Sequence, residues 1–214
     1  MKCLIVNFNR LVLPVKLAEW VALRRCEPVY IDNHSTYPPL LEYYKTTPFE
    51  VLRLPTNYGH TVLWQYPLLR ELNIKERFIY TDPDLDLTGV PDDFIDVMSA
   101  GLDKYPQFDK CGLSLEINDL PDNEEGNYIK YGPEKPMWED PLDDMYFRAI
   151  TDTTFAMYRQ PVKEYSHSAI RTNRPYTCKH LPWYYTDFDS LTEDERYYYL
   201  SANKSCTHKD RFMK

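Results

Sequence analysis

The chain has 214 residues, 43% of them hydrophobic, and this length suits one globular domain that builds its own core. Its formal net charge of −8 argues against nucleic acid as a partner, because such binding depends on Lys and Arg side chains that neutralise phosphates. No apolar run approaches the roughly 20 residues that cross a bilayer, and the five cysteines are widely spaced without a C-x-x-C pair. We therefore expect a cytoplasmic protein with no transmembrane segment, no disulfide framework and no zinc-thiolate site.

The first half of the sequence alternates short apolar runs with helical patterns, which is typical of a parallel sheet built from strand-helix units. The expected strands cover 4–7, 29–31, 51–54 and 78–80, and the expected helices cover 14–25, 38–44 and about 61–72. In such sheets ligands bind at the carboxyl ends of the strands. The pattern predicts an α/β fold with a central, mostly parallel sheet flanked by helices.

The second half of the sequence is less regular. Helical patterns are found at 92–102 and from Thr192 onward, and extended patterns at 113–117 and 153–158. Residues 118–144 form a long polar stretch rich in Pro, Gly and acidic residues, and such a stretch in a compact domain is usually functional or mobile. No repeat or linker divides the chain, so a single domain over 1–214 is expected.

Three aspartates at alternate positions, Asp82, Asp84 and Asp86, directly follow the fourth expected strand. Like charges this close raise one another's pKa values, and a divalent cation removes that penalty. Oxygen ligands without a cysteine favour Mg²⁺ or Mn²⁺. A solvated acidic turn explains most D-x-D sequences, but the position at a strand end favours a metal site here.

Two other sites could contain these aspartates. A calcium EF-hand loop starting at Asp82 requires Gly and Glu where the sequence has Leu87 and Asp93, so this alternative is excluded. The segment 84–88 fits the D-x-D-x-T motif of aspartate-nucleophile phosphatases. The preceding strand ends about three residues too early for that motif, and no later G-D-x-x-x-D completes it. A phosphatase therefore stays an alternative of lower rank.

Four segments resemble the motifs of GT-A-fold glycosyltransferases, with family-2-like spacing. VNFNR at 6–10 is similar to P-T-Y-N-R, with Val6 in place of the usual proline, and IDNHST at 31–36 is similar to V-D-D-G-S-T. NYGH at 57–60 resembles N-x-G-[KR], and DPD at 82–84 stands where these enzymes have D-A-D. Each segment lies at the end of an expected strand or the start of an expected helix, and the four occur in the family's order.

The resemblance implies a single Rossmann-like GT-A domain with a nucleotide-sugar-binding half, 1–110, and an acceptor-binding half, 111–214. It implies a metal-dependent enzyme that moves a hexose or deoxyhexose from a UDP-sugar to a hydroxyl of a glycan or glycoprotein. The later segments 152–159 and 180–184 resemble a small subgroup of these enzymes from chlorella viruses, where such a domain begins a multidomain protein. That subgroup implies capsid glycan synthesis in the host cytoplasm.

Carried over to this sequence, the resemblance assigns nucleotide-binding roles to several strand-end residues. Asp32 would accept a hydrogen bond from uracil, although capping the turn at Ser35 or Thr36 is an equally good use of its carboxylate. The other expected nucleotide-binding residues edge the uridine, shape its loop or reach the ribose, and they are Asn7, Phe8, Asn9, Asn57, Gly59 and Asp82.

The resemblance also assigns a metal site. Asp84 would bind the metal directly, Asp82 would reach the ribose or the metal, and Asp86 is an additional acid outside the family's core motif. Some GT-A enzymes add a late histidine, and a neutral imidazole is a competent ligand for Mn²⁺. His180 is the candidate here, with a packed structural role as the alternative.

On the acceptor side, Asp152 begins an expected strand that should line the active site. It is the preferred acid-base or nucleophilic residue, although a structural hydrogen bond to the adjacent threonines explains it as well. Trp138, in the polar stretch 118–144, is expected to offer its ring to a sugar face. The sequence leaves open whether the transfer inverts or retains configuration.

Two further functions remain as alternatives. A sugar-phosphate nucleotidyltransferase shares the sheet and the metal, but it normally opens with a glycine-rich loop, and no glycine occurs in the first 58 residues here. A carbohydrate-binding module would use the 19 tyrosines and four tryptophans, but it has no need of three aspartates at a strand end.

Overall fold

Four apolar segments of the first half form the parallel part of the main sheet. They are β1 (Lys2–Asn7), β2 (Glu27–Asp32), β3 (Glu50–Arg53) and β4 (Phe78–Thr81), paired in the order β3-β2-β1-β4. Leu4 of β1 pairs with Val29 and Tyr80 on either side, and all three are fully buried. Strands covered on both faces need continuous apolar runs, which is what the sequence has. The computed structural model describes residues 1–162 and 165–202.

The second half adds four strands to this sheet. β9 (Ala156–Tyr158) lies antiparallel between β4 and β6 (Lys110–Gly112), followed by β10 (Ala169–Thr172) and the edge strand β8 (Tyr146–Arg148). Within the described residues the sheet therefore has eight mostly parallel strands. A second sheet, in the order β5-β11-β7, contains β5 (Leu85–Asp86), β11 (Thr177–His180) and β7 (Ser114–Leu115).

Helices cover both faces of the main sheet, as the sequence predicts. Cys3 and Ile5 of β1 belong to one apolar cluster together with α1 (Val12–Ala22) and α5 (Phe94–Lys104). Leu4 and Val6 belong to another cluster, with α3 (Val62–Gln65) and α4 (Leu68–Glu71). The short α2 (Pro38–Tyr43) follows β2 and begins at a proline.

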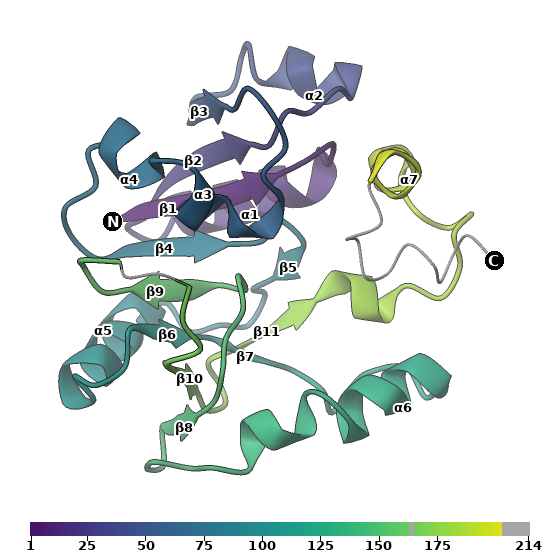
Figure 1. Cartoon of the computed structure of the whole chain (residues 1–214). Coiled ribbons are helices and arrows are strands. Elements are labelled where there is room, and N and C mark those ends of the chain that lie inside the picture. The colour runs from purple at the N-terminus through teal and green to yellow at the C-terminus, as the bar shows by residue number, and fades with distance from the viewer. Residues whose placement is uncertain (163–164, 203–214) are drawn as a thin grey trace.

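The remaining helices lie toward the carboxyl ends of the parallel strands. They are α6 (Glu124–Tyr131), α7 (Glu193–Ser201) and the 3₁₀ segments η1 (Gly59–Thr61), η2 (Lys135–Trp138) and η3 (Leu181–Tyr184). β1, β2 and β4 point toward the side where α7 lies, and β11 runs between α7 and α6 (Figure 1). None of the helices in the described part of the chain is long and apolar enough to cross a membrane.

The α/β fold expected from the sequence is confirmed, with two local differences. The helix expected over about 61–72 is divided into α3 and α4, because Pro67 forces the preceding Tyr66 into an extended conformation. The polar stretch 118–144 is not one loop, since it contains α6 and η2. Asn123 starts α6 by accepting a hydrogen bond from the Gly126 amide, an N-cap that the sequence analysis missed.

Candidate functional site

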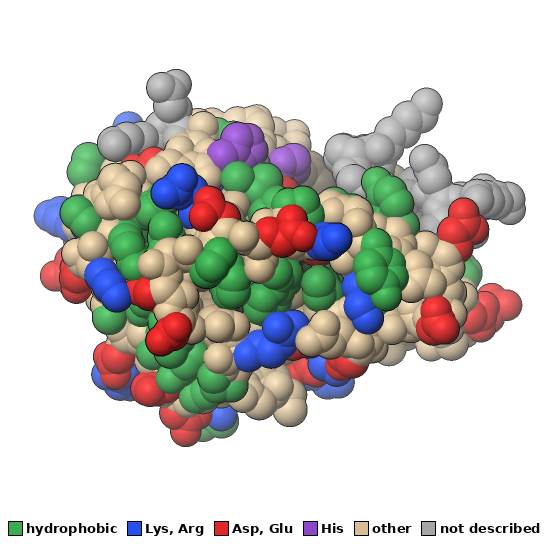
Figure 2. Space-filling model, turned by 90° about the horizontal axis from the view of Figure 1, so that it is seen from below, with side chains coloured by type: hydrophobic (Ala, Val, Ile, Leu, Met, Phe, Trp, Pro, Cys, Tyr) green, Lys and Arg blue, Asp and Glu red, His purple; other side chains and the backbone are tan. Residues whose placement is uncertain are grey.

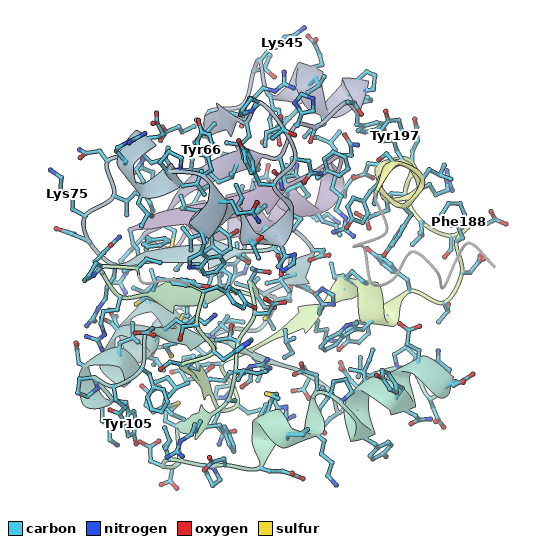
Figure 3. All side chains as sticks on the ribbon, viewed as in Figure 1. Lys45, Tyr66, Lys75, Tyr105, Phe188 and Tyr197 are labelled. Atoms are coloured by element: carbon cyan, nitrogen blue, oxygen red, sulfur yellow. The ribbon has the colours of Figure 1, made fainter. Side chains whose placement is uncertain are left out.

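A hollow of about 150 Å³ lies at the carboxyl ends of β1, β2 and β4, and we call it the amide hollow because Asn7, Asn33 and Asn57 line it. Its other lining residues come from the same strand ends, from η1 and from the end of α7, and they are Val6, Phe8, Arg10, Gly59, His60, Asp82, Pro83, Tyr198 and Ala202. Tyr197 of α7 lies on this side of the molecule and Lys75, before β4, on the opposite side (Figure 3). The hollow is therefore at the edge where open α/β sheets bind ligands.

Hydrogen bonds to the backbone fix the amides of this hollow. The Asn7 Nδ2 atom donates to the Arg10 carbonyl at 2.8 Å, whereas its buried Oδ1 has no hydrogen-bond partner among the described residues. Asn33 accepts from the Tyr58 amide at 2.8 Å and donates to the Gly59 carbonyl at 2.9 Å. Asn33, just after β2, therefore holds the loop before η1, and Asn7 Oδ1 is a buried acceptor without a partner among the described residues.

The glycine of the loop before η1 is required by its backbone. Gly59 has φ +68°, in the left-handed region that side chains disfavour, and its amide donates to Asn57 Oδ1 at 2.8 Å. Both residues line the amide hollow, as does Phe8, whose ring lies edge-on to Tyr198 at 6.5 Å. The structure therefore brings together Asn7, Phe8, Asn57, Gly59 and Asp82 of the nucleotide-binding set expected from the sequence.

Two residues of that expected set do not line the hollow. Asp32 is fully buried, with Oδ1 accepting from the Ser35 amide at 3.2 Å and Oδ2 paired with Arg53 Nε at 2.8 Å. Both of its oxygens are used inside the protein, so Asp32 caps the turn and the neighbouring Asn33 lines the hollow in its place. Asn9 is also buried, and it accepts from the Thr36 and Tyr37 amides, which secures the turn after β2.

An ion-pair cluster lies behind the hollow. The Arg10 guanidinium pairs with Asp84 at 2.6 Å and with Glu195 of α7 at 2.8 Å, and all three side chains are buried. The Tyr198 ring lies 3.7 Å from the guanidinium carbon of Arg10. His180 Nε2, from β11, is 3.6 Å from Asp84 Oδ1. Four segments distant in sequence thus meet at the second aspartate of the D-x-D motif.

The electrostatics of this cluster show an excess of negative charge. Burial, and then the charge of Asp84, raise the pKa of Asp82 to about 7 even though the Thr153 hydroxyl donates to its carboxylate at 2.8 Å. Burial raises the pKa of Glu195 to about 7 despite its pairing with Arg10. Burial works against ionisation of Asp84 too, but the Arg10 guanidinium holds the pKa of Asp84 below its ordinary value. Three carboxylates thus share one guanidinium, and burial lowers the pKa of His180, which keeps the imidazole neutral.

These residues fit a divalent cation, although they do not form a complete site by themselves. Asp84 Oδ1 is buried without a hydrogen-bond partner in the described structure, and it lies beside a neutral imidazole. A carboxylate oxygen and an imidazole nitrogen are suitable ligands for Mn²⁺ or Mg²⁺. Nowhere in residues 1–162 and 165–202 are three or more His, Cys, Asp or Glu side chains grouped so that they could hold a metal. A cation here therefore needs ligands from a bound diphosphate or from water.

The third aspartate of the motif lies elsewhere. Asp86 accepts from the Thr88 amide at 2.8 Å and lines a separate hollow with Trp20 and Lys16 of α1. It is next to β11, where it pairs with Lys179 in the sheet register. The structure thus separates Asp86 from Asp82 and Asp84, because alternate residues of an extended segment share a face only while the chain stays straight, and here the chain bends at Pro83 before it enters β5.

A second hollow, of about 450 Å³, adjoins the first. We call it the aromatic hollow, because Tyr128, Trp183, Tyr198 and Tyr199 line it. Its other lining residues are Leu115, Ile129, Pro133, Glu134, Asp152, Thr153, Thr154, Arg171 and His180, and it shares Arg10, His60, Asp82 and Tyr198 with the amide hollow. The two hollows therefore meet at the aspartate cluster.

Asp152 lies in the aromatic hollow, as expected. Its side chain is exposed, its Oδ1 accepts from the Tyr165 hydroxyl at 2.7 Å, and its carbonyl accepts from Lys110 Nζ at 3.2 Å. Trp138 does not line this hollow. It packs on Phe147 at 5.5 Å between ring centroids, with the Arg174 guanidinium 4.1 Å from its ring, so it is part of a packed layer behind the site.

Several residues that the structure brings to the two hollows or to the ion-pair cluster are not among the site residues predicted from the sequence. They are Arg10, Asn33, Tyr128, Trp183, Glu195 and Tyr198. Arg10 and Asn33 lie inside the recognised segments and could have been found there. The others come from α6, η3 and α7, whose position relative to β1 is set by tertiary contacts that no local pattern records.

Comparisons with known proteins agree with this fold. No protein-family model and no curated protein matches the sequence. Among solved structures, the chain is similar to the mannosyltransferase PcManGT from Pyrobaculum calidifontis in complex with GDP-Man and Mn²⁺, with a TM-score of 0.54 and 12% identity over 84% of this chain and 56% of that one. It is also similar to residues 1–349 of S. aureus TarS, with a TM-score of 0.42 and 15% identity over 74% of this chain and 46% of that one. The chain spans about half the length of these two proteins, and the likeness to PcManGT shows a shared fold.

Proposed function

We propose that this chain is a glycosyltransferase that uses a nucleotide-sugar donor and a divalent cation. The observation that carries the proposal is the meeting of the amide hollow and the aromatic hollow at Arg10 and Asp82, where Arg10 is paired with Asp84. A nucleoside in the first hollow and an acceptor in the second would bring the diphosphate and the sugar to this junction. The fold shared with PcManGT, which was solved with GDP-Man and Mn²⁺, supports the same function.

The donor we propose is a UDP-sugar that carries a hexose or a deoxyhexose. Asn7 lines the amide hollow with an Oδ1 atom that accepts no hydrogen bond from the described residues, and this atom can accept the N3–H of uracil. Asn33 and Asn57 are already engaged with the loop at Gly59, so they shape the hollow. The resemblance of 6–10 and 57–60 to glycosyltransferase motifs favours uridine over guanosine.

Asp84 and His180 are the residues that would hold the cation, and Asp82 would contact either the cation or the ribose. A bound Mn²⁺ or Mg²⁺ would act as a Lewis acid that neutralises the charge of the departing diphosphate. Arg10 also lies at the junction of the two hollows, where Asp84 and Glu195 balance its charge. Glu195 holds this guanidinium in place from the opposite side.

Asp152 is the carboxylate we propose for the acceptor side. It is an exposed acid in the aromatic hollow, and the Tyr165 hydroxyl orients it through Oδ1. Its second oxygen can accept the proton of an incoming hydroxyl if the transfer inverts configuration. In a retaining transfer the same carboxylate would stay beside the anomeric carbon. A glycan or glycoprotein is the proposed acceptor, and the viral subgroup resembled by 152–159 makes a capsid glycan in a host cytoplasm its expected setting.

Calorimetry with UDP and with GDP, in Mn²⁺ and in EDTA, tests this proposal. UDP should bind about tenfold more tightly with Mn²⁺ than with EDTA, and GDP should compete poorly. Equal UDP affinity under both conditions would remove the cation from the proposal. A carbohydrate-binding module would bind neither UDP nor Mn²⁺, and a nucleotidyltransferase would consume a nucleoside triphosphate.

The phosphatase alternative loses support from the geometry of Asp84. The nucleophile of such an enzyme must reach the substrate phosphorus, but Asp84 is only 5% exposed and one of its oxygens is paired with Arg10. Release of phosphate from a sugar phosphate, without any nucleotide, would restore that alternative.

A further inference from the structure

The aromatic hollow has an exposed tyrosine at its rim. Tyr128 of α6 is 69% exposed and lines the hollow, whereas Trp183, Tyr198 and Tyr199 line it from partly or fully buried positions on η3 and α7. An aromatic ring at the surface of a hollow offers a flat apolar face and a polar tip. Rings from three separate elements thus converge on one space.

The basic and acidic side chains around these rings differ in whether they have a partner of opposite charge. Arg171 is paired with Glu134 at 2.7 Å, and Arg10 is paired with both Asp84 and Glu195. Both arginines that line the hollow are therefore neutralised within the described structure. Asp152 makes no ion pair with any described residue, and Asp82 interacts with the Thr153 hydroxyl instead of a cation. Among the described residues that line the hollow, the side chains without an oppositely charged partner are therefore carboxylates.

The surface around α6 carries charges of both signs. The face of the molecule that includes α6 has acidic and basic side chains interspersed with hydrophobic ones (Figure 2). Inside the hollow, an anionic acceptor would be placed beside the Asp152 carboxylate, and like charges in a partly desolvated site repel strongly.

We propose that the aromatic hollow binds a neutral saccharide acceptor, with a sugar face on the Tyr128 ring, and that it rejects acceptors carrying a carboxylate or a phosphate. This inference rests on the proposed function, because it assigns the acceptor class of the same site. The Arg171–Glu134 pair at the wall can meet sugar hydroxyls as donor and acceptor without presenting net charge. Tyr128 is then the specificity residue at the entrance.

A matched pair of variants tests the ring. Tyr131 lies one turn further along α6 and is 65% exposed, nearly as much as Tyr128, but it does not line the hollow. Tyr128→Ala should raise the acceptor KM about tenfold, whereas Tyr131→Ala should leave it unchanged. UDP affinity, measured by calorimetry in Mn²⁺, should match that of the wild-type protein in both variants, because neither ring lines the amide hollow.

A matched pair of acceptors tests the charge. Cellobiose and cellobiouronic acid differ by one carboxylate, and each is added to the protein with UDP-glucose or UDP-rhamnose, whichever the wild-type protein hydrolyses faster. Cellobiose should accelerate UDP release, and cellobiouronic acid should not. Saturation-transfer NMR in the presence of UDP and Mn²⁺ should show binding of cellobiose alone, and this signal should weaken in Tyr128→Ala.

Several results would overturn the inference while leaving the proposed function standing. These are equal acceptor KM values in Tyr128→Ala and Tyr131→Ala, preferential use of the uronic acid, or no response to either saccharide by a protein that still hydrolyses the donor. Failure of the wild-type protein to bind UDP or to hydrolyse any UDP-sugar is a different result. It would overturn the proposed function and the acceptor inference with it.

Discussion

The amide hollow and the aromatic hollow are adjacent, but different kinds of polar side chain line them. The amide hollow is lined by the neutral side chains Asn7, Asn33 and Asn57, and its loops follow directly from β1, β2 and β3. The aromatic hollow combines rings with ionised groups, among them Asp152 and the Arg171–Glu134 pair, and it is built by later segments. Both hollows share the junction, which is formed by Arg10, His60, Asp82 and Tyr198.

The difference has consequences for how each region responds to change. A buried amide needs only hydrogen-bond partners, and the short turns at strand ends supply them from the backbone. A buried charge needs a partner of opposite sign, and removing that partner is costly. We therefore expect the three asparagines of the amide hollow to add little pH dependence to binding. We expect the junction, where Asp82 has a pKa of about 7, and the aromatic hollow to be sensitive to single charge changes.

The largest effect is expected at the junction. Asp84→Asn keeps the shape of the side chain but removes the charge that pairs with Arg10 and faces His180. We expect transfer to fall about 10³-fold, because the metal's stabilisation of the leaving diphosphate is worth several kcal/mol. The measurement is UDP release from the donor in the presence of acceptor, together with UDP affinity in Mn²⁺ and in EDTA.

Asp86→Asn is the control for Asp84→Asn, because Asp86 lies in the same segment but lines a different hollow. It should leave transfer near the wild-type rate. Asp84→Ala is a poorer test, since it leaves Arg10 with one partner fewer in a buried cluster and should destabilise the fold by about 3 kcal/mol or more. Equal losses in the Asp84 and Asp86 variants would contradict the separation of the two aspartates.

A smaller effect is expected inside the aromatic hollow. Asp152→Asn preserves the hydrogen bond from Tyr165 to Oδ1 but removes the carboxylate that takes the acceptor's proton. Transfer should fall about 10²-fold, the usual contribution of a general base, while UDP affinity in Mn²⁺ stays at the wild-type value. A matching loss of UDP affinity would instead assign Asp152 to the junction, and an unchanged rate would make it structural.

Tyr165→Phe distinguishes orientation from chemistry in the same experiment. The variant keeps the Asp152 carboxylate and removes only the hydroxyl that fixes Oδ1. Its rate should lie between those of the wild-type protein and Asp152→Asn, because the carboxylate is retained but is no longer oriented by the hydroxyl.

The two hollows also differ in how far the sequence predicts them. Asn7, Asn57 and Asp82 follow strands whose apolar runs are continuous, so strand pattern and motif agree on where these side chains lie. Asn9 and Asp32 are the exceptions on this side, and for Asp32 the motif favours the nucleotide whereas the structure shows the turn cap. Local geometry decides that case, since Arg53 of β3 occupies the other oxygen.

The aromatic hollow could be predicted only in part. The place of Asp152 before an expected strand predicts that it faces the active site, and Asp152 lines the aromatic hollow. Trp138, which the sequence predicts at the acceptor, packs against Phe147 instead. The choice of ring depends on how α6, η3 and α7 lie over β11, and these elements are linked by contacts across more than 50 residues, such as Tyr184 with Asp119. Composition shows that rings are abundant, but only tertiary packing shows which of them line the hollow.

The smallest effect is expected beneath the aromatic hollow, where the second half of the chain buries a lysine. Lys110 of β6 is 1% exposed, and its Nζ lies 3.2 Å from the Asp152 carbonyl. Burial lowers the pKa of Lys110 from its ordinary 10.5 to about 8, although the nearby Asp152 carboxylate opposes the shift. The folded protein therefore holds this proton less tightly than the unfolded chain does, and the charge reduces the stability at neutral pH. Between about pH 8 and 10.5 the folded state releases the proton first, so this penalty shrinks as pH rises through that range.

Lys110→Met should accordingly raise Tm by a few degrees at pH 7, and the gain should diminish toward pH 10. Lys104→Met is the control, because a hydrogen bond with Asp143 raises the pKa of the exposed Lys104, so its contribution is present at pH 7 and fades above 10.5. A lower Tm for Lys110→Met at pH 7 would mean that the contact with the Asp152 carbonyl outweighs the cost of burial. The charged groups would then stabilise the aromatic hollow, as the amides stabilise the amide hollow.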